Sequence, residues 1–159
     1  MDFDLINIGI ADMAVAASPN ILRTILGSCV GICMYDPEVK VGGLAHIMLP
    51  TSKKASDNLK KYADTAIPLM IDEMIKLGSD INRMVVKLAG GATMFKHTEH
   101  SIVGDIGQNN INSVKEVLSK LKIPVLSEDV GGDYGRTIDF YLEKGMIKIK
   151  AIGVETKII

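Results

Sequence analysis

The stretch ILRTILGSCVGICMYD, residues 21–36, contains two short apolar runs on either side of a glycine-serine pair. The runs Ile21–Leu26 and Val30–Met34 are each short enough to form a buried strand. The glycine-serine pair between them is typical of a turn, since glycine interrupts a strand pattern. The stretch therefore predicts two buried strands and places Cys29 where the chain enters the second one.

A further apolar run, LAHIML at 44–49, follows a Gly-Gly pair and ends at Pro50. Proline ends a strand because it has no N–H to donate. Side chains alternate across a strand, so we expect Leu44, His46 and Met48 to share one face. This strand is expected to neighbour the one that begins after Cys29.

The middle of the chain changes from strand to helix periodicity. Apolar residues recur at intervals of three and four from about Asp57 to Leu77, which predicts a helix. Gly78 is expected to end it, and Pro68 is expected to kink or break it. A second helix is predicted from about Asn110 to Lys120, with Asn109 or Asn110 as its N-cap.

The remaining apolar runs are short and strand-like. They are residues 7–17, MVVKLAGGA at 84–92, PVLSEDV at 124–130, TIDFYLE at 137–143 and MIKIKAIGV at 146–154. Lys144-Gly145 suits a hairpin turn between the last two. Strands at both ends with helices between them predict a mixed α/β or α+β sandwich.

Composition narrows the class of protein. The chain has 159 residues, which suits a single domain spanning 1–159. Its net charge of −1 and its lack of tryptophan give no reason to expect nucleic acid as a partner. The acidic start is unlike a secretory signal, and no apolar run is long enough to cross a membrane. Two cysteines make no disulfide framework, so we expect a cytoplasmic protein with free thiols.

Cys29 has two interpretations. Free cysteines are usually small buried hydrophobes, and Cys33 fits that description. Cys29 differs because Gly27 and Ser28 precede it, and a glycine turn lets backbone approach a substrate. Backbone N–H groups at such a turn could stabilise an oxyanion.

His46 is the candidate partner of Cys29, although a histidine on an apolar strand is often a satisfied core residue. Adjacent strands lie about 4.8 Å apart, so the two side chains could meet. A nearby imidazolium lowers the pKa of a thiol, and a Cys–His pair can attack an amide, ester or thioester. Thr24 could orient the imidazole, or it could simply be a β-forming residue.

Metal and phosphate sites are weaker interpretations. The candidate metal ligands Cys29, Cys33, His46, His97 and His100 lack the paired spacing of structural zinc sites. The glycine-rich stretches AGGATMF and VGGDYGR lack the order of residues found in phosphate-binding loops. We expect these stretches to be tight turns between strands.

Seven short stretches together resemble one family. They are TILGSCV at 24–30, DP at 36–37, GGLAHIMLP at 42–50, KYADTAIP at 61–68, AGGATMF at 89–95, IGQNN at 106–110 and GGDYGR at 131–136. In these stretches the sequence resembles the CheD family, the chemoreceptor glutamine deamidases of bacterial and archaeal chemotaxis. The resemblance implies a layered α/β/β sandwich similar to the catalytic domain of cytotoxic necrotizing factor, a toxin deamidase.

The resemblance also implies a site and a reaction. The catalytic set is Cys29, His46 and Thr24, and no metal or organic cofactor is required. Selected glutamines of methyl-accepting receptors become glutamates through a thioester on the cysteine. The implied partners are those receptors and CheC, a phosphatase that acts on the response regulator CheY. The alternative is an interaction protein that regulates CheC and has little catalysis of its own.

Overall fold

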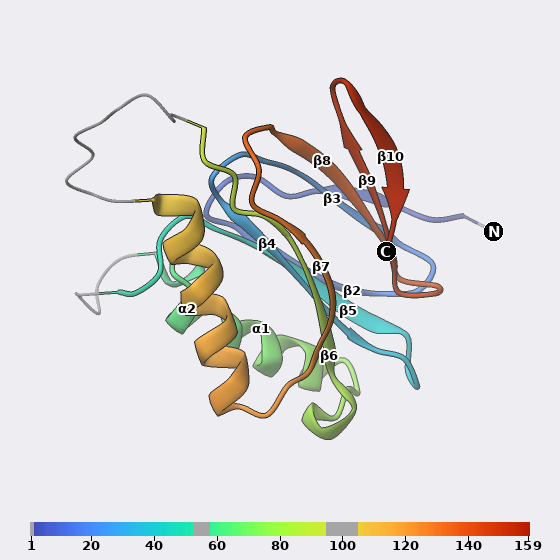
Figure 1. The fold of residues 1–159 in the computed structure, drawn as a ribbon. Coiled ribbons are helices and arrows are strands. Elements are labelled where there is room, and N and C mark those ends of the chain that lie inside the picture. Colours follow the sequence, from blue (N-terminus) through green and yellow to red (C-terminus); the bar gives the residue numbers. More distant parts are fainter. Residues whose placement is uncertain (1, 53–57, 95–104) are drawn as a thin grey trace.

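The computed structural model describes residues 2–52, 58–94 and 105–159. Within these ranges the chain forms two five-stranded sheets and two α-helices (Figure 1). The strands are β1 (Leu5–Asn7), β2 (Met13–Ala17), β3 (Ile21–Leu26), β4 (Val30–Asp36), β5 (Val41–Ile47), β6 (Val85–Gly90), β7 (Val125–Val130), β8 (Arg136–Tyr141), β9 (Met146–Ala151) and β10 (Val154–Ile158). The α-helices are α1 (Ala63–Lys76) and α2 (Ile106–Lys120), and the short 3-10 helices are Leu59–Lys61 and Ile81–Arg83.

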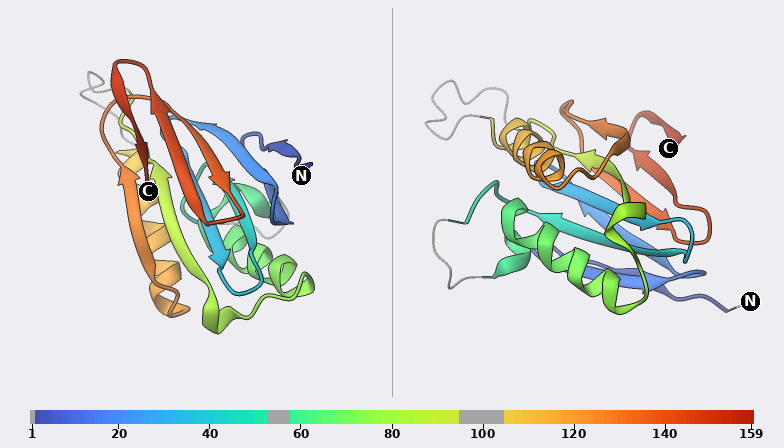
Figure 2. Two further views of the ribbon diagram at one scale, coloured as in Figure 1. Left: turned by 90° about the vertical axis from the view of Figure 1, so that its right-hand side faces the viewer. Right: turned by 90° about the horizontal axis from the view of Figure 1, so that it is seen from below.

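The molecule has three layers. One sheet has the strand order β2-β5-β4-β6-β7, and the other has the order β1-β3-β8-β9-β10. Both helices cover the outer face of the first sheet, and the second sheet packs against its inner face (Figures 1 and 2). This arrangement confirms the predicted α+β sandwich with α/β/β layers.

Alternation along β4 divides its side chains between two cores. Val30, Ile32 and Met34 pack with the helices. Cys33 and Tyr35 pack between the two sheets. Because successive strand residues point to opposite faces, Cys29 and Gly31 also belong to the face between the sheets.

Strand boundaries follow the sequence closely where the pattern is local. The structure confirms β3 at Ile21–Leu26. β5 begins at Val41 rather than Leu44, so the glycine pair lies inside the strand. A Cβ on Gly42 would meet Leu142 Cδ2 at 2.6 Å, and one on Gly43 would meet Met70 Cγ at 2.8 Å. These glycines therefore allow close packing of the layers and do not form a turn.

The first helix differs from its prediction at its start. Tyr62 is extended, with φ −115° and ψ 142°, so α1 begins at Ala63. The α-helix is continuous through Pro68, and the predicted break is wrong. Its buried face packs on the sheet, and this tertiary contact outweighs the hydrogen bond that proline removes.

Gly78 ends the first helix as predicted. Its φ is +101°, which favours glycine. Its N–H donates to the Ile75 carbonyl at 2.9 Å, and the Ser79 N–H donates to the Met74 carbonyl at 3.1 Å. Together these bonds form a Schellman motif.

The second helix starts earlier than predicted, and the predicted N-cap is wrong. The cap is Asp105, whose side chain accepts from the Gln108 N–H at 3.1 Å. Asn109 is exposed, and Asn110 is buried inside the helix. Near the C-terminus Gly145 forms the predicted hairpin turn with φ +74°, and β10 is an additional strand.

Candidate active site

Two strands from different sheets bring Thr24 and His46 together. Thr24 lies on β3 and His46 on β5, and both side chains point between the sheets. They are 3% and 2% exposed, respectively. The Thr24 Oγ1 lies 2.7 Å from His46 Nδ1. The structure therefore places the predicted orienting hydroxyl against the predicted imidazole.

A third group fixes the direction of this hydrogen bond. Thr24 Oγ1 donates to the Ile8 carbonyl at 2.7 Å. A hydroxyl has one hydrogen, and a carbonyl can only accept. Thr24 Oγ1 must therefore accept from His46, so Nδ1 carries the imidazole hydrogen. In the neutral ring this leaves Nε2 unprotonated, with its lone pair free.

Burial keeps the His46 ring neutral. Loss of solvation lowers the pKa of His46 from its ordinary value of 6.5 to about 4. Its only hydrogen-bond partner within the described part of the chain is a hydroxyl, which stabilises an imidazolium less than a carboxylate does. Nε2 is buried and has no hydrogen-bond partner among the described residues. This atom is a base without a bound proton.

Cys29 lies on the same inner face as His46. In the pairing of β4 with β5, Gly31 stands opposite His46. Cys29 is two residues before Gly31 and directly precedes β4, so it lies at the end of the strand pair that carries His46. Its side chain is half-buried.

The charge state at Cys29 differs from the sequence expectation of a thiol activated by an imidazolium. Burial raises the pKa of the Cys29 thiol, and its own backbone N–H opposes part of that rise. The resting site therefore contains a neutral thiol and a neutral imidazole.

The three carbonyls of the Gly27–Cys29 loop all point into the protein. The Gly27 carbonyl accepts from the Ala92 N–H at 3.0 Å, and the Cys29 carbonyl accepts from the Gly91 N–H at 2.8 Å. The Ser28 carbonyl accepts from Asn110 Nδ2 at 3.3 Å. Among the described residues, no hydrogen bond to another residue uses a backbone N–H of this loop as its donor. The loop therefore has its N–H groups available.

The turn that holds this loop is itself supported by the GGDYGR stretch. The Gly90 carbonyl accepts from the Gly131 N–H at 2.9 Å and from Arg136 at 3.4 Å. Arg136 is buried and pairs with Asp129 at 3.0 Å. The sequence predicted a turn for this stretch but no role for Arg136, and it predicted Asn110 as a possible helix cap and not as a partner of the loop. The sequence signal that could have indicated both residues is that they are polar residues inside the glycine-containing stretches IGQNN and GGDYGR.

The other predicted candidates do not join the site. Cys33 is buried between the sheets, and burial strongly raises the pKa of its thiol. His97 and His100 lie outside the described residues. In the described ranges, no three histidine, cysteine, aspartate or glutamate side chains are grouped to hold a metal ion.

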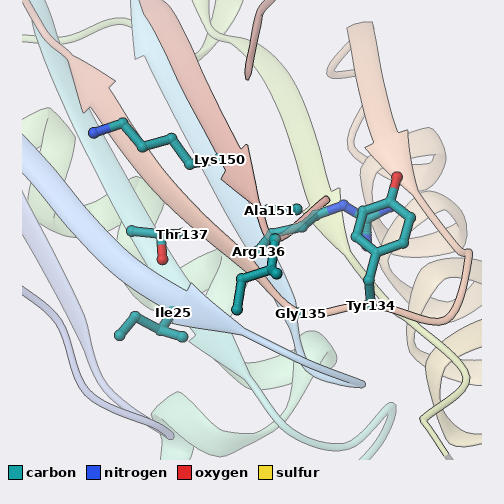
Figure 3. A pocket seen from close by; sticks show the side chains of 8 residues that line it. Ile25, Tyr134, Gly135, Arg136, Thr137, Lys150 and Ala151 are labelled. Atoms are coloured by element: carbon teal, nitrogen blue, oxygen red, sulfur yellow. The ribbon is translucent and has the colours of Figure 1, made fainter. Parts of the chain in front are cut away.

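A cavity of about 460 Å³ lies on the outer face of the second sheet, near the end of β3 (Figure 3). Ile25, Thr137 and Lys150 line it from three neighbouring strands, in register with one another. Tyr134 and Arg136 form its other side. Thr24 points to the opposite face of this sheet, toward His46 on the first sheet, so the cavity does not contain the Thr–His pair.

Fold and site together define a double-sheet sandwich with a buried Thr–His pair and a half-buried thiol on the face between the sheets, a set of groups that can support cysteine-based acyl transfer. The family model described as CheD chemotactic sensory transduction matches residues 48–151. A relative from Caldanaerobacter subterraneus subsp. tengcongensis, named a probable chemoreceptor glutamine deamidase CheD, is 52% identical over 162 residues, with 100% of both chains covered. This chain belongs to the CheD family.

Other similar proteins agree with this assignment. Relatives of the same name from Desulforamulus reducens and Clostridium novyi are 52% and 48% identical, and 97% of this chain is covered in each case, with 95% and 97% of theirs. The match to the Caldanaerobacter relative spans the whole chain, including residues 1–47, which precede the stretch matched by the family model.

The fold also has a solved relative. A Neisseria meningitidis protein of family DUF152 has a similar fold, with TM-score 0.53, 8% identity, and coverage of 80% of this chain and 64% of that one. None of the helices in the described ranges is long and apolar enough to span a bilayer.

Proposed function

We propose that this protein is a glutamine deamidase of chemotaxis receptors, with Cys29 as nucleophile, His46 as base and acid, and Thr24 as the residue that positions the imidazole. The observation that carries the proposal is the Thr24 hydrogen bond to His46, because it leaves a free Nε2 lone pair on the face shared with Cys29. The printed names of the full-length relatives supply the substrate class.

The first step forms a bond between Cys29 Sγ and the side-chain carbonyl carbon of a glutamine. The thiol proton moves to His46 Nε2 as the sulfur attacks, and the carbonyl π electrons move to the oxygen. A neutral base is suited to this transfer, because an imidazole that is already protonated could not accept the proton. Thr24 keeps Nε2, and not Nδ1, as the accepting atom.

The oxyanion is stabilised by the backbone of the Gly27–Cys29 loop. Its carbonyls are bound on the protein side, which leaves the N–H groups of Ser28 and Cys29 to donate outward. Preorganised backbone donors of this kind contribute a large share of the catalysis in acyl transfer. The predicted oxyanion turn of Gly27 and Ser28 thus extends to the N–H of Cys29.

The second half of the reaction restores the enzyme. The proton on His46 Nε2 passes to the amide nitrogen, the carbon–nitrogen bond breaks, and ammonia leaves. A water molecule then gives a proton to Nε2 and attacks the thioester. The carbon–sulfur bond breaks, the sulfur regains its proton, and a glutamate side chain is released. No metal or organic cofactor has a part in these steps.

The test is mass spectrometry of a purified receptor fragment after incubation with the protein. A glutamine that becomes glutamate gains about 1 Da, and ammonia is released in equal amount. Cys29→Ala should abolish both signals. Cys33→Ala is the matched control and should retain them, since Cys33 is only 1% exposed and a substrate cannot reach its sulfur. Conversion by the Cys29→Ala protein would contradict the mechanism.

Binding of a CheC phosphatase also belongs to this proposal and rests on the family resemblance. A location in the cytoplasm belongs to it too and rests on the expectation of free thiols. The Cys29→Ala variant separates binding from catalysis, because it should still regulate the phosphatase while it no longer deamidates. A wild-type protein that stimulates the phosphatase but releases no ammonia would favour the alternative role as an interaction protein.

A further inference from the structure

We infer that Asn110 is a positioning residue for deamidation, because it fixes the peptide group whose N–H belongs to Cys29. The inference rests on the proposed function, since it concerns a donor to the oxyanion of that reaction. Asn110 lies on α2, far from Cys29 in sequence. Its side chain is fully buried and contacts the Gly27–Cys29 loop directly.

The geometry of one peptide bond carries the argument. The Ser28 carbonyl and the Cys29 N–H belong to the same planar, trans peptide unit, so they point in opposite directions. Asn110 Nδ2 donates to the Ser28 carbonyl and so holds that oxygen toward α2. The Cys29 N–H must then face away from α2. No hydrogen bond to another described residue uses this N–H, so it is available to the oxyanion that forms beside Cys29.

A second hydrogen bond fixes the orientation of the Asn110 side-chain amide. The same Nδ2 donates to the Met48 carbonyl at 2.9 Å. Met48 follows His46 by two residues and lies just beyond the end of β5. One amide group therefore joins the loop that carries the thiol to the chain segment next to the imidazole. With both Nδ2 hydrogens bound to carbonyl oxygens, the nitrogen and oxygen of the amide cannot exchange places without losing both bonds.

The Asn110 side chain destabilises the folded state through its oxygen, which argues that asparagine has a role here beyond packing. Asn110 Oδ1 is buried and has no hydrogen-bond partner among the described residues. An unsatisfied buried acceptor destabilises the folded state. A leucine would fill a similar volume on the buried face of the helix without that penalty.

The start of α2 packs closely against the turn that binds the Gly27–Cys29 loop. A Cβ on Gly107 would lie 2.6 Å from the Ala92 carbonyl oxygen, so glycine is needed for the helix to pack on this turn. The turn residues Gly91 and Ala92 are the ones that donate to the loop carbonyls. The IGQNN stretch thus supplies a glycine for close approach and, one helical turn later, the asparagine that binds the loop.

The experiment compares wild type, Asn110→Asp and Asn110→Leu on a receptor fragment. Asn110→Asp keeps the side-chain shape and loses the donor, and Asn110→Leu loses it without adding charge. We expect kcat to fall about tenfold to a hundredfold with KM unchanged within about twofold, since oxyanion donors act on the transition state. The matched control is Asn109→Asp, which adds the same charge at an exposed position of α2 and should deamidate as wild type.

A second readout separates positioning from general damage to the site. This readout is the rate of Cys29 alkylation by iodoacetamide, measured by peptide mass mapping. Alkylation passes through no oxyanion. Its rate should stay within about threefold of wild type in both Asn110 variants, because only the oxyanion donor is disturbed.

Three outcomes would overturn the inference. Wild-type deamidation by either folded Asn110 variant would overturn it, as would alkylation that slows in parallel with deamidation. If wild type itself releases no ammonia, the proposed function fails and this inference fails with it.

Discussion

Cys29 and Cys33 lie four positions apart and both face the space between the sheets, yet their exposure and the hydrogen bonding of their backbone differ. Cys33 is inside β4, where it is paired with Leu44 and Lys87 on the neighbouring strands and is 1% exposed. Cys29 precedes β4, is half-buried, and lies on a loop whose carbonyls are all bound to other parts of the chain.

The position of Cys29 at the start of a strand distinguishes it from Cys33, because backbone N–H groups are available there. Inside β4 the backbone groups are used by the sheet ladder, so none is left to bind a substrate. At Gly27–Cys29 the ladder has not begun, and the N–H groups have no other partner among the described residues. Both thiols have a raised pKa from burial, so reactivity at Cys29 must come from its neighbours.

The largest expected contrast is in alkylation of the two thiols. In the folded protein Cys33 should react at least about a thousandfold more slowly than Cys29, since it becomes accessible only when the sandwich opens. Peptide mapping after timed exposure to iodoacetamide measures both rates in one sample. In concentrated urea the two rates should converge. Similar rates without urea would mean that β4 does not protect Cys33.

The next contrast is in stability against acid. The folded-state pKa of His46 is lowered from 6.5 to about 4, so the unfolded chain binds a proton more readily over that range. Stability from this group is fully present above pH 6.5 and is lost as the pH falls toward 4. At about 1.4 kcal/mol per pKa unit, the loss amounts to about 3 kcal/mol.

Urea unfolding at a series of pH values measures this loss. His46→Gln should flatten the curve between pH 6.5 and 4, because glutamine does not titrate. Cys33→Ala is the control, and it should keep the wild-type slope since it leaves His46 in place. An unchanged slope in the His46→Gln protein would show that other groups cause the acid sensitivity.

The smallest expected effect concerns the residue that sets the His46 tautomer. Thr24→Val keeps the side-chain shape but removes the oxygen that accepts from Nδ1. We expect kcat to fall about tenfold to a hundredfold, a part of what general base catalysis contributes. Thr24→Ser retains the oxygen and should stay near the wild-type rate. Steady-state ammonia release by the two variants checks this, and equal rates for valine and serine would contradict the assigned hydrogen-bond direction.

Much of the frame around Cys29 could be predicted because its signals are local. The two apolar runs on either side of the Gly-Ser pair predicted the strands before and after Cys29. Alternation along the next strand predicted that Leu44 and His46 share one face. Gly78 ended its helix as expected because a single residue with positive φ suffices for that motif.

The supports of the site could not be predicted because they depend on contacts between distant segments. Asn109 or Asn110 was expected to cap the second helix, whereas Asp105 does so and Asn110 binds the Ser28 carbonyl. Pro68 was expected to kink or break α1, but the helix runs through it without a break and packs on the sheet. Periodicity within one segment carries no information about which loop a helix will reach.

The Ile8 carbonyl has a particular consequence for how this site can change over evolution. It belongs to the main chain, so replacing the side chain at position 8 leaves the acceptor in place. The backbone position of the Ile8 carbonyl therefore determines that Thr24 donates to Ile8 and accepts from His46. Only a shift of the N-terminal segment itself could reverse it.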